Sequence, residues 1–317
     1  MPSRRVIGID AGGTKLLGGV VDEGLVIHHR VHSTWRGADH QETLEIVAEA
    51  VEELRAAAPD VEAVGFGIPS LVEWESGVSV WSNHLPIGDV RFRELMGERL
   101  GLPVLVDNDA NTAALAEHRH GAARGFDHAV LVALGTGVGA GLVLDGRIYR
   151  GSRGFAGELG HLVVDHEGED CPGACPGRGC LEVLASGRAI GRTAERAAQD
   201  RPDSALGRRR AQGGEITGAL VTELAHDGDA QARAVLAEVG RGLGAGLTGI
   251  VNALNPEIVV VGGGAVAAGD LLLDSAREMV SARALPPCAA VRIVVARFGE
   301  EAGMLGAAVM ALEGGPA

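Results

Sequence analysis

Residues 5–24, RVIGIDAGGTKLLGGVVDEG, decide the fold of this chain. An apolar run ends at Asp10, a glycine turn follows, and a second apolar run leads into an acidic-glycine turn. This order predicts a β-hairpin with a glycine-rich tip. Residues 129–146, AVLVALGTGVGAGLVLDG, repeat the order, which places Asp10 and Leu134 at equivalent strand ends. Two copies of one hairpin predict two related α/β domains facing each other across a cleft.

The rest of the chain alternates between helix-like and strand-like patterns. We expect helices over residues 40–58, 109–121, 215–226, 230–252, 270–284 and 302–313. We expect buried strands over residues 61–68 and 104–106, and further strands over 257–261 and 291–296. The alternation predicts a smaller N-terminal domain over 1–118 and a larger one over 119–301, with the segment 302–317 packing back on the first.

Two common nucleotide-binding motifs do not fit the glycine turns. A P-loop needs Gly-x4-Gly-Lys-Ser/Thr, and no such string occurs. Residues 135–140, GTGVGA, match a dinucleotide fingerprint, but a strand follows them where that motif requires a helix. The duplicated hairpin instead predicts an actin-like (ribonuclease-H-like) ATPase fold whose two tips bind the phosphates of ATP. The residues expected to bind ATP and Mg²⁺ are Asp10, Gly12, Gly13, Thr14, Lys15, Gly135, Thr136 and Gly137, with the turn Gly262, Gly263 and Gly264 near adenosine.

Lys15 is the only lysine in a chain with 28 lysine and arginine residues. It lies in the first glycine turn, where unhindered backbone N–H groups can approach phosphate oxygens and an ammonium supplies a point charge. Asp10, at the end of the preceding strand, is a carboxylate of the kind that binds Mg²⁺.

Residues 106–111, VDNDAN, lie at a strand-to-helix junction, where open α/β folds bind ligands. Because Asp and Asn are favoured helix caps, we expect Asp107 or Asn108 to cap the helix while a neighbour faces the cleft. Asp109 falls in the first helical turn, where the helix dipole is expected to lower its pKa. Such an aspartate is a weak base, but in phosphoryl transfer it positions a hydroxyl and accepts the proton late.

A histidine and three cysteines predict a structural zinc site in the irregular segment 150–182. One imidazole and three thiolates are a common tetrahedral Zn²⁺ set, and the surrounding glycines let a short loop wrap the ion. A loop of free thiols is the alternative. A closed zinc coordination would fix the loop and make Glu158 and Glu182 fixed hydrogen-bond partners for a polyol. The expected zinc ligands are His161, Cys171, Cys175 and Cys180.

Composition narrows the possible partners. The formal charge of −14 and the pI near 5.2 disfavour nucleic-acid binding through a phosphate-tracking surface. We recognise no signal peptide and expect no apolar stretch to reach the roughly 18 residues of a membrane helix, so no membrane partner is expected. Cysteines clustered as metal ligands rather than as a disulfide framework favour a cytoplasmic location.

From about Val6 to Ala308, the chain resembles the ROK family of sugar kinases and related repressors, in particular its bacterial glucokinases. The resemblance rests on motifs that occur in the family's order. These are the Asp-x-Gly-Gly-Thr-Lys turn, Asn-Asp-Ala-Asn at 108–111, Gly-Thr-Gly at 135–137, Glu-x-Gly-His at 158–161, the cysteine loop, and Asn-Pro-Glu-x5-Gly-Gly-Gly at 255–264.

The resemblance implies phosphorylation of D-glucose at its 6-hydroxyl by ATP, with Asp109 as the catalytic base. It implies a homodimer or homotetramer. It also implies that the histidine ligates zinc as well as sugar. The positions implied to bind sugar are Asn108, Glu158, His161 and Glu182, with Asn83 as a further contact.

Several alternatives stay open. Mannose, fructose, N-acetylmannosamine and N-acetylglucosamine are other possible substrates, and polyphosphate is another possible donor. A non-catalytic sugar-sensing regulator is the alternative from a different class; repressors of the family carry a DNA-binding helix-turn-helix before the first hairpin, whereas five residues precede Val6 here. The cysteine loop runs Cys-x3-Cys-x4-Cys, two residues longer than the family's common Cys-x-Cys-x4-Cys.

Overall fold

The computed structural model describes residues 3–35 and 37–314, which form two compact units. Within this range, the first unit comprises residues 3–131, 140–157 and 296–314. The second comprises Val132–Gly139 and Glu158–Val295. The first unit therefore runs past the predicted boundary at residue 118, and the C-terminal segment belongs to it.

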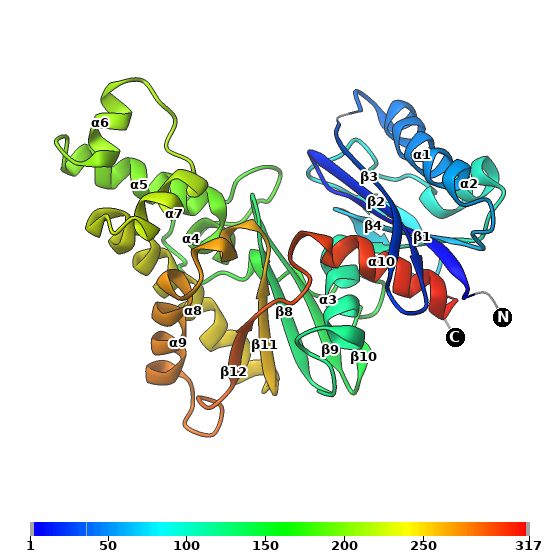
Figure 1. Ribbon diagram of the computed structural model, residues 1–317. Helices are drawn as coiled ribbons and strands as arrows, with labels where there is room; N and C mark the ends of the chain where they lie inside the picture. Colours follow the sequence, from blue (N-terminus) through cyan, green and yellow to red (C-terminus); the bar gives the residue numbers. More distant parts are fainter. Residues whose placement is uncertain (1–2, 36, 315–317) are drawn as a thin grey trace. The chain divides into compact units, whose positions relative to one another are not determined.

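Two five-stranded sheets share one strand order, β3-β2-β1-β4-β7 and β10-β9-β8-β11-β12 (Figure 1). In the first sheet, β1 pairs antiparallel with β2 and parallel with β4. The equivalence of the two orders confirms the repeat that the hairpins predicted, and with it the actin-like fold. The strands are β1 (Arg5–Ala11), β2 (Lys15–Asp22), β3 (Ile27–Thr34), β4 (Val64–Ile68), β7 (Val104–Asn108), β8 (Ala129–Leu134), β9 (Val138–Leu144), β10 (Arg147–Ile148), β11 (Ile258–Gly262) and β12 (Arg292–Val295), with a separate pair β5 (Leu71–Glu73) and β6 (Val78–Trp81).

Six helices lie where the sequence predicted them, with ends shifted by no more than three residues. They are α1 (His40–Ala57), α3 (Asp109–His120), α7 (Gly218–His226), α8 (Ala230–Leu254), α9 (Asp270–Arg283) and α10 (Ala302–Glu313). The sequence reading did not identify α2 (Phe92–Leu100), α4 (Leu181–Ala185), α5 (Gly187–Asp200), α6 (Ala205–Ala211) or the short 3₁₀ turns η1 (Leu159–His161), η2 (Gly264–Ala268) and η3 (Gly299–Glu301). It also missed β3, whose largely exposed side chains lack an apolar stripe.

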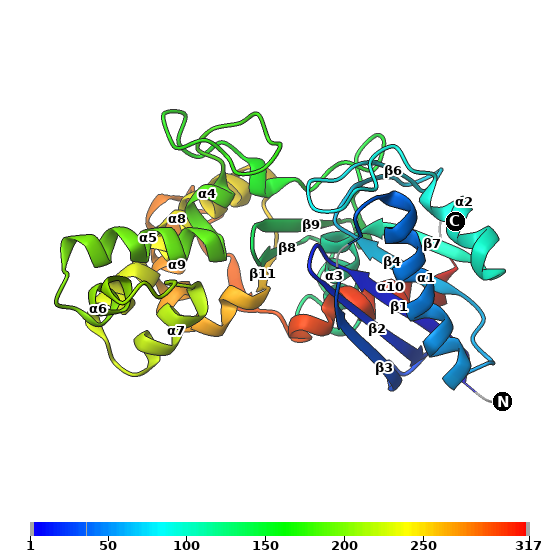
Figure 2. The same cartoon turned by 90° about the horizontal axis from the view of Figure 1, so that it is seen from above.

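The first sheet is covered on both faces (Figure 2). Because side chains alternate along a strand, Ile7 and Ile9 of β1 pack with α1 and α2 in one core. Val6 packs with α10 in the other. On that second face Gly8 and Asp10 follow Val6 at two-residue spacing. The face covered by α3 and α10 is therefore also the face on which β1 presents its carboxylate.

Glycines in β1 and β4 let α10 approach the sheet closely. A Cβ on Gly65 would lie 1.9 Å from the carbonyl oxygen of Ala307, and one on Gly8 would lie 2.2 Å from that of Met304. Backbone atoms cannot give way as a flexible side chain can, so these two strand positions accept only glycine.

In the second unit, α8 packs against α9, α4, α5 and α7. Within residues 3–35 and 37–314, it is the one helix long and apolar enough to cross a membrane by length and composition, so the expectation that no stretch meets this test is wrong. Of its most apolar window, 56% is buried inside the protein, as in the core helix of a globular domain.

We predict that Gly65→Ala lowers the free energy of unfolding by about 1–3 kcal/mol or more, because the added methyl group overlaps the backbone of α10. Gly97→Ala is the matched control, since a Cβ there meets its first neighbour at 4.0 Å and alanine favours the helix interior. Urea unfolding of both variants makes the comparison. Equal stabilities would contradict the close approach of α10.

Candidate functional site

The first glycine tip joins β1 to β2 and is braced by Trp35. The Trp35 indole donates a hydrogen bond to the carbonyl oxygen of Gly12 at 3.1 Å, and its backbone N–H donates to that of Thr14 at 3.2 Å. Trp35 is only 8% exposed. The backbone of this tip is thus fixed by a residue that sequence reasoning did not single out.

Lys15 is the first residue of β2, and its ammonium lies 3.8 Å from a carboxylate oxygen of Glu300. Both side chains are well exposed, at 59% and 74%. Exposed pairs of this kind contribute about 0–1 kcal/mol. Lys15 can therefore exchange Glu300 for another anion at little cost in free energy.

Asp10 lies against the first turn of α10, where a Cβ on Gly303 would be 2.4 Å from its carboxylate. Loss of hydration, helped by the charge of Asp109, raises the pKa of Asp10 to about 8. A carboxyl group with so high a pKa is one that a cation would readily ionise and bind. This environment fits the predicted magnesium ligand.

Asp109 is the first residue of α3, and burial raises its pKa. The backbone N–H of Ala110 and the charge of the nearby His84 oppose this rise. The expectation of a lowered pKa is therefore wrong, because loss of hydration outweighs the favourable field of the helix N-terminus. A raised pKa makes Asp109 a better proton acceptor than the sequence suggested.

Asn108 caps α3, as predicted for this junction. Its side-chain oxygen accepts hydrogen bonds from the N–H groups of Ala110 at 2.9 Å and Asn111 at 3.2 Å. Its side-chain amide donates to the carbonyl oxygen of Ser70 at 3.3 Å. These bonds fix the side-chain orientation and leave one amide N–H for a ligand.

Asn83 lies in the loop after β6 and lines an open cavity of about 470 Å³. The cavity is formed by Gly37, Ala38, Glu42, Asn83, His84, Leu85 and Pro86. The neighbouring His84 rests on the first glycine tip, since a Cβ on Gly13 would lie 2.9 Å from that of His84. The sequence reading did not identify His84, because nothing local connects it to the tip.

The second glycine tip, between β8 and β9, is held by Glu182 of α4. A carboxylate oxygen of Glu182 accepts a hydrogen bond from the N–H of Val138 at 2.8 Å. A Cβ on Gly137 would lie 2.0 Å from that oxygen, so the carboxylate needs a glycine there. Glu182, predicted as a sugar ligand, is thus placed directly at this tip.

The turn Gly262–Gly264 begins at the last residue of β11 and approaches the end of β8. Gly263 has a φ of +81°, and a Cβ there would lie 2.5 Å from the carbonyl oxygen of Leu134, the residue before Gly135. Gly264 has no atom within 4 Å of the corresponding position and therefore leaves space beside its backbone. The second unit thus brings two of the three predicted glycine turns together.

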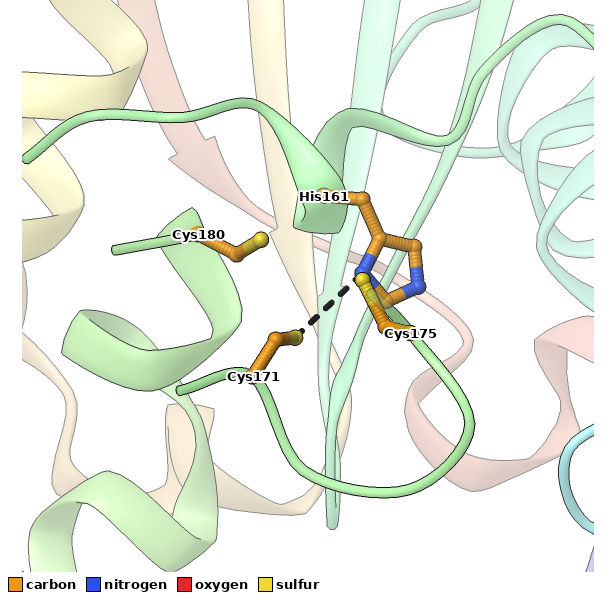
Figure 3. Close-up of side chains that lie close together, drawn as sticks. All are labelled: His161, Cys171, Cys175 and Cys180. Carbon is orange, nitrogen blue, oxygen red and sulfur yellow. Dashed lines mark hydrogen bonds between the residues drawn. The ribbon is translucent and has the colours of Figure 1, made fainter. Parts of the chain in front are cut away.

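The predicted metal ligands converge in the second unit (Figure 3). The ligand atoms of His161, Cys171, Cys175 and Cys180 lie within 4.8 Å of one another, and His161 Nδ1 is 3.5 Å from the sulfur of Cys171. Burial raises the pKa of the Cys171 and Cys180 thiols. A cation would be needed to ionise them, which fits a metal-binding set.

The longer spacing between Cys171 and Cys175 does not exclude Cys171 from this set. The loop turns back at Gly173, whose φ is +79°, and antiparallel bridges join Asp170 to Arg178 and Val163 to Cys180. With Nδ1 directed at the cysteines, the other ring nitrogen of His161 lies 3.9 Å from a carboxylate oxygen of Glu158. The imidazole therefore connects the metal set to a predicted sugar ligand.

The matches to known proteins extend over nearly the whole chain. A family model described as "ROK family" matches residues 6–314. A glucokinase of Halalkalibacterium halodurans is 33% identical over 96% of this chain and 94% of its own length. A putative xylose repressor of a Caldicellulosiruptor species is 32% identical over 97% of this chain and 78% of its own. The crystal structure of a ROK family glucokinase from Streptomyces griseus with glucose and AMPPNP superposes with a TM-score of 0.88, at 33% identity, covering 98% of this chain and 100% of that one.

We predict that Asp10 makes the cation-free protein less stable as the pH rises. Because its pKa in the folded state, about 8, exceeds the ordinary value of 3.8, its contribution is fully present below pH 4 and is lost as the pH rises through 8. In the presence of a chelator, Asp10→Asn should therefore melt above the wild type at pH 8 and close to it at pH 4. The exposed Asp60→Asn is the control and should show no such change. A pH-independent difference would contradict the assigned environment.

Proposed function

The chain belongs to the ROK family, and on this basis we propose that it is an ATP-dependent hexose kinase that phosphorylates D-glucose at the 6-hydroxyl. The observation that carries the proposal is the half-buried carboxylate of Asp109, held at the start of α3 with a raised pKa in the same unit as the first glycine tip. Such a group is suited to accept a proton from a hydroxyl close to bound phosphates.

In the proposed reaction, Asp109 accepts the proton of the sugar 6-hydroxyl as its oxygen attacks the γ-phosphorus of ATP. The phosphorus–oxygen bond to ADP breaks, and the products are hexose 6-phosphate and ADP. Since phosphoryl transfer has a loose transition state, the proton leaves late, and the main role of Asp109 is to orient the hydroxyl.

The two glycine tips, Gly12–Lys15 and Gly135–Gly137, are the proposed phosphate-binding segments. Their backbone is fixed by Trp35 in the first unit and by Glu182 in the second. Asp10 is the proposed partner of Mg²⁺, which when bound neutralises charge on the phosphates. The easily exchanged contact of Lys15 with Glu300 leaves its ammonium available to a phosphate.

The proposed sugar ligands are Asn83, Asn108 and Asp109 in the first unit and Glu158, His161 and Glu182 in the second. His161 would serve both metal and sugar, since its two ring nitrogens are directed at different partners. Zinc is the proposed metal. Four ligands about 2.0–2.3 Å from one Zn²⁺ lie within about 4 Å of one another, which the observed clustering within 4.8 Å approaches.

A sugar-sensing regulator is the second candidate, since relatives include proteins named xylose repressors. Sugar sensing has no need of a base with a raised pKa or of a carboxylate that favours a cation, and this chain has both, in Asp109 and Asp10. Kinases of another hexose or of an N-acetylhexosamine share the proposed mechanism and differ only in the sugar.

We predict that Asp109→Asn lowers kcat by about 10²–10⁴-fold while the protein remains folded, because the amide cannot accept the proton. The assay is sugar 6-phosphate formation from Mg-ATP with glucose, mannose, fructose, N-acetylmannosamine and N-acetylglucosamine. Asp145→Asn is the control, since Asp145 is 92% exposed and has a φ of +52°, which asparagine tolerates.

Each outcome of this assay bears on one part of the proposal. Highest kcat/KM for glucose, lost in Asp109→Asn, is the expected result. Preference for another sugar would retain the mechanism and correct the substrate. Near-normal turnover in Asp109→Asn would exclude Asp109 as the base, and sugar binding without turnover would favour the regulator.

We predict about one Zn²⁺ per chain in the purified protein, lost in Cys175→Ser together with sugar binding. Cys288→Ser is the matched control, since Cys288 lies outside the ligand set. Metal analysis by mass spectrometry and glucose binding by calorimetry make the two measurements. A metal-free protein that binds glucose normally would contradict the zinc proposal.

A further inference from the structure

Asp107 carries a buried carboxylate that the proposed reaction does not use. The residue is only 2% exposed and ends its strand directly before the cap of α3. One oxygen accepts hydrogen bonds from the backbone N–H of Asn108 at 2.8 Å and from the side-chain amide of Asn111 at 3.0 Å. The other accepts one from Arg150 Nε at 2.7 Å. The carboxylate therefore fixes both the residue before Asp109 and the first turn of the helix.

Arg150, the partner of Asp107, is held in turn by Trp74. Arg150 follows β10 in the chain, and its guanidinium lies 3.5 Å from the centre of the Trp74 ring. The Arg150 side chain is 18% exposed and that of Asp107 only 3%. Loss of hydration raises the pKa of Asp107, and the charge of Arg150 is the largest influence opposing that rise. The pair is thus a fixed, largely desolvated contact rather than a surface ion pair.

Asn111, which donates a hydrogen bond to Asp107, lies near Gly157. Asn111 is 1% exposed, and its side-chain oxygen has no hydrogen-bond partner within the described part of the chain. A Cβ on Gly157 would lie 3.9 Å from that oxygen. Gly157 has a φ of +98° and directly precedes Glu158. Gly157, which leads to a proposed sugar ligand, therefore lies near the unpartnered oxygen of Asn111.

We infer that Asp107 and Arg150 are positioning residues that orient Asn108 and Asp109 for phosphoryl transfer, with Trp74 fixing Arg150. This inference rests on the proposed kinase function. Replacing a buried ion pair by apolar residues is often neutral or stabilising, so the pair is weak as a source of stability. Its hydrogen bonds instead fix Asn108 and, through Asn111, the first turn of α3, which begins at Asp109.

Arg150→Met tests the inference against Arg153→Met as the matched control. Arg153 lies in the same loop, is 60% exposed and pairs with Glu73. With the best hexose as substrate, Arg150→Met should lower kcat by about 10²-fold and raise the sugar KM, since a misplacement of about 1 Å can cost this much. The KM for ATP should change little. Arg150→Lys, which restores the charge, should recover part of kcat, and Arg153→Met should match the wild type.

A purely structural role predicts a different pattern. Across the variants, kcat and the KM values for sugar and ATP would then all worsen in step with the fall in melting temperature. Arg150→Lys would not recover kcat beyond what its melting temperature explains. That pattern would overturn the inference. If Arg150→Met does not fold, Trp74→Leu takes its place, because it releases the guanidinium without stranding a buried charge. Wild-type kcat in folded Trp74→Leu would then refute the positioning role.

A second measurement separates this inference from the proposed function. If the wild type phosphorylates no hexose, the proposed function fails, and hydrogen exchange of residues 104–115 decides whether the pair orders the start of α3. Faster exchange there in Arg150→Met or Trp74→Leu, and not in Arg153→Met, would support the orienting contact. Unchanged exchange would overturn it.

Discussion

The structure of the first unit depends on accommodating carboxylates in a poorly hydrated environment at the carboxyl ends of β1 and β7. Asp107 pairs with Arg150 and accepts three hydrogen bonds, one of them from Arg150 itself. Loss of hydration raises the pKa of all three carboxyl groups; the charge of Arg150 opposes that rise for Asp107, whereas the charge of Asp109 adds to it for Asp10. Asp107 thus has a fixed cationic partner in Arg150, whereas Asp10 and Asp109 lie in environments that favour a proton or a bound cation. That division matches a structural role for the first and a chemical role for the others.

The two units build similar sheets but fix their glycine tips by different contacts. Trp35 donates to the carbonyl oxygen of Gly12 in the first, whereas Glu182 accepts from the N–H of Val138 in the second. The second contact uses a carboxylate that is also a proposed sugar ligand. If Glu182 binds sugar as proposed, sugar binding and the shape of this tip are physically coupled within the second unit, through one side chain.

Features specified by local patterns were predictable from the sequence, and those made by distant contacts were not. The hairpins, the main helices and the Asn108 cap follow from hydrophobic period, glycine turns and capping chemistry. The cysteine set was predictable because its ligand types and spacing are distinctive. Trp35 and Arg150 were missed because they lie 23 and 43 residues from Gly12 and Asp107. The pKa direction of Asp109 was wrong for the same reason, since burial is a property of the tertiary structure.

Phosphorus NMR of a mixture of the protein, Mg-ATP and glucose tests the central claim most directly. The account predicts that the γ-phosphate signal of ATP is replaced by one phosphomonoester signal, coupled to the C6 protons of glucose, with ADP formed in equal amount. Release of inorganic phosphate in place of the sugar ester, or unchanged ATP while glucose is bound, would contradict the account.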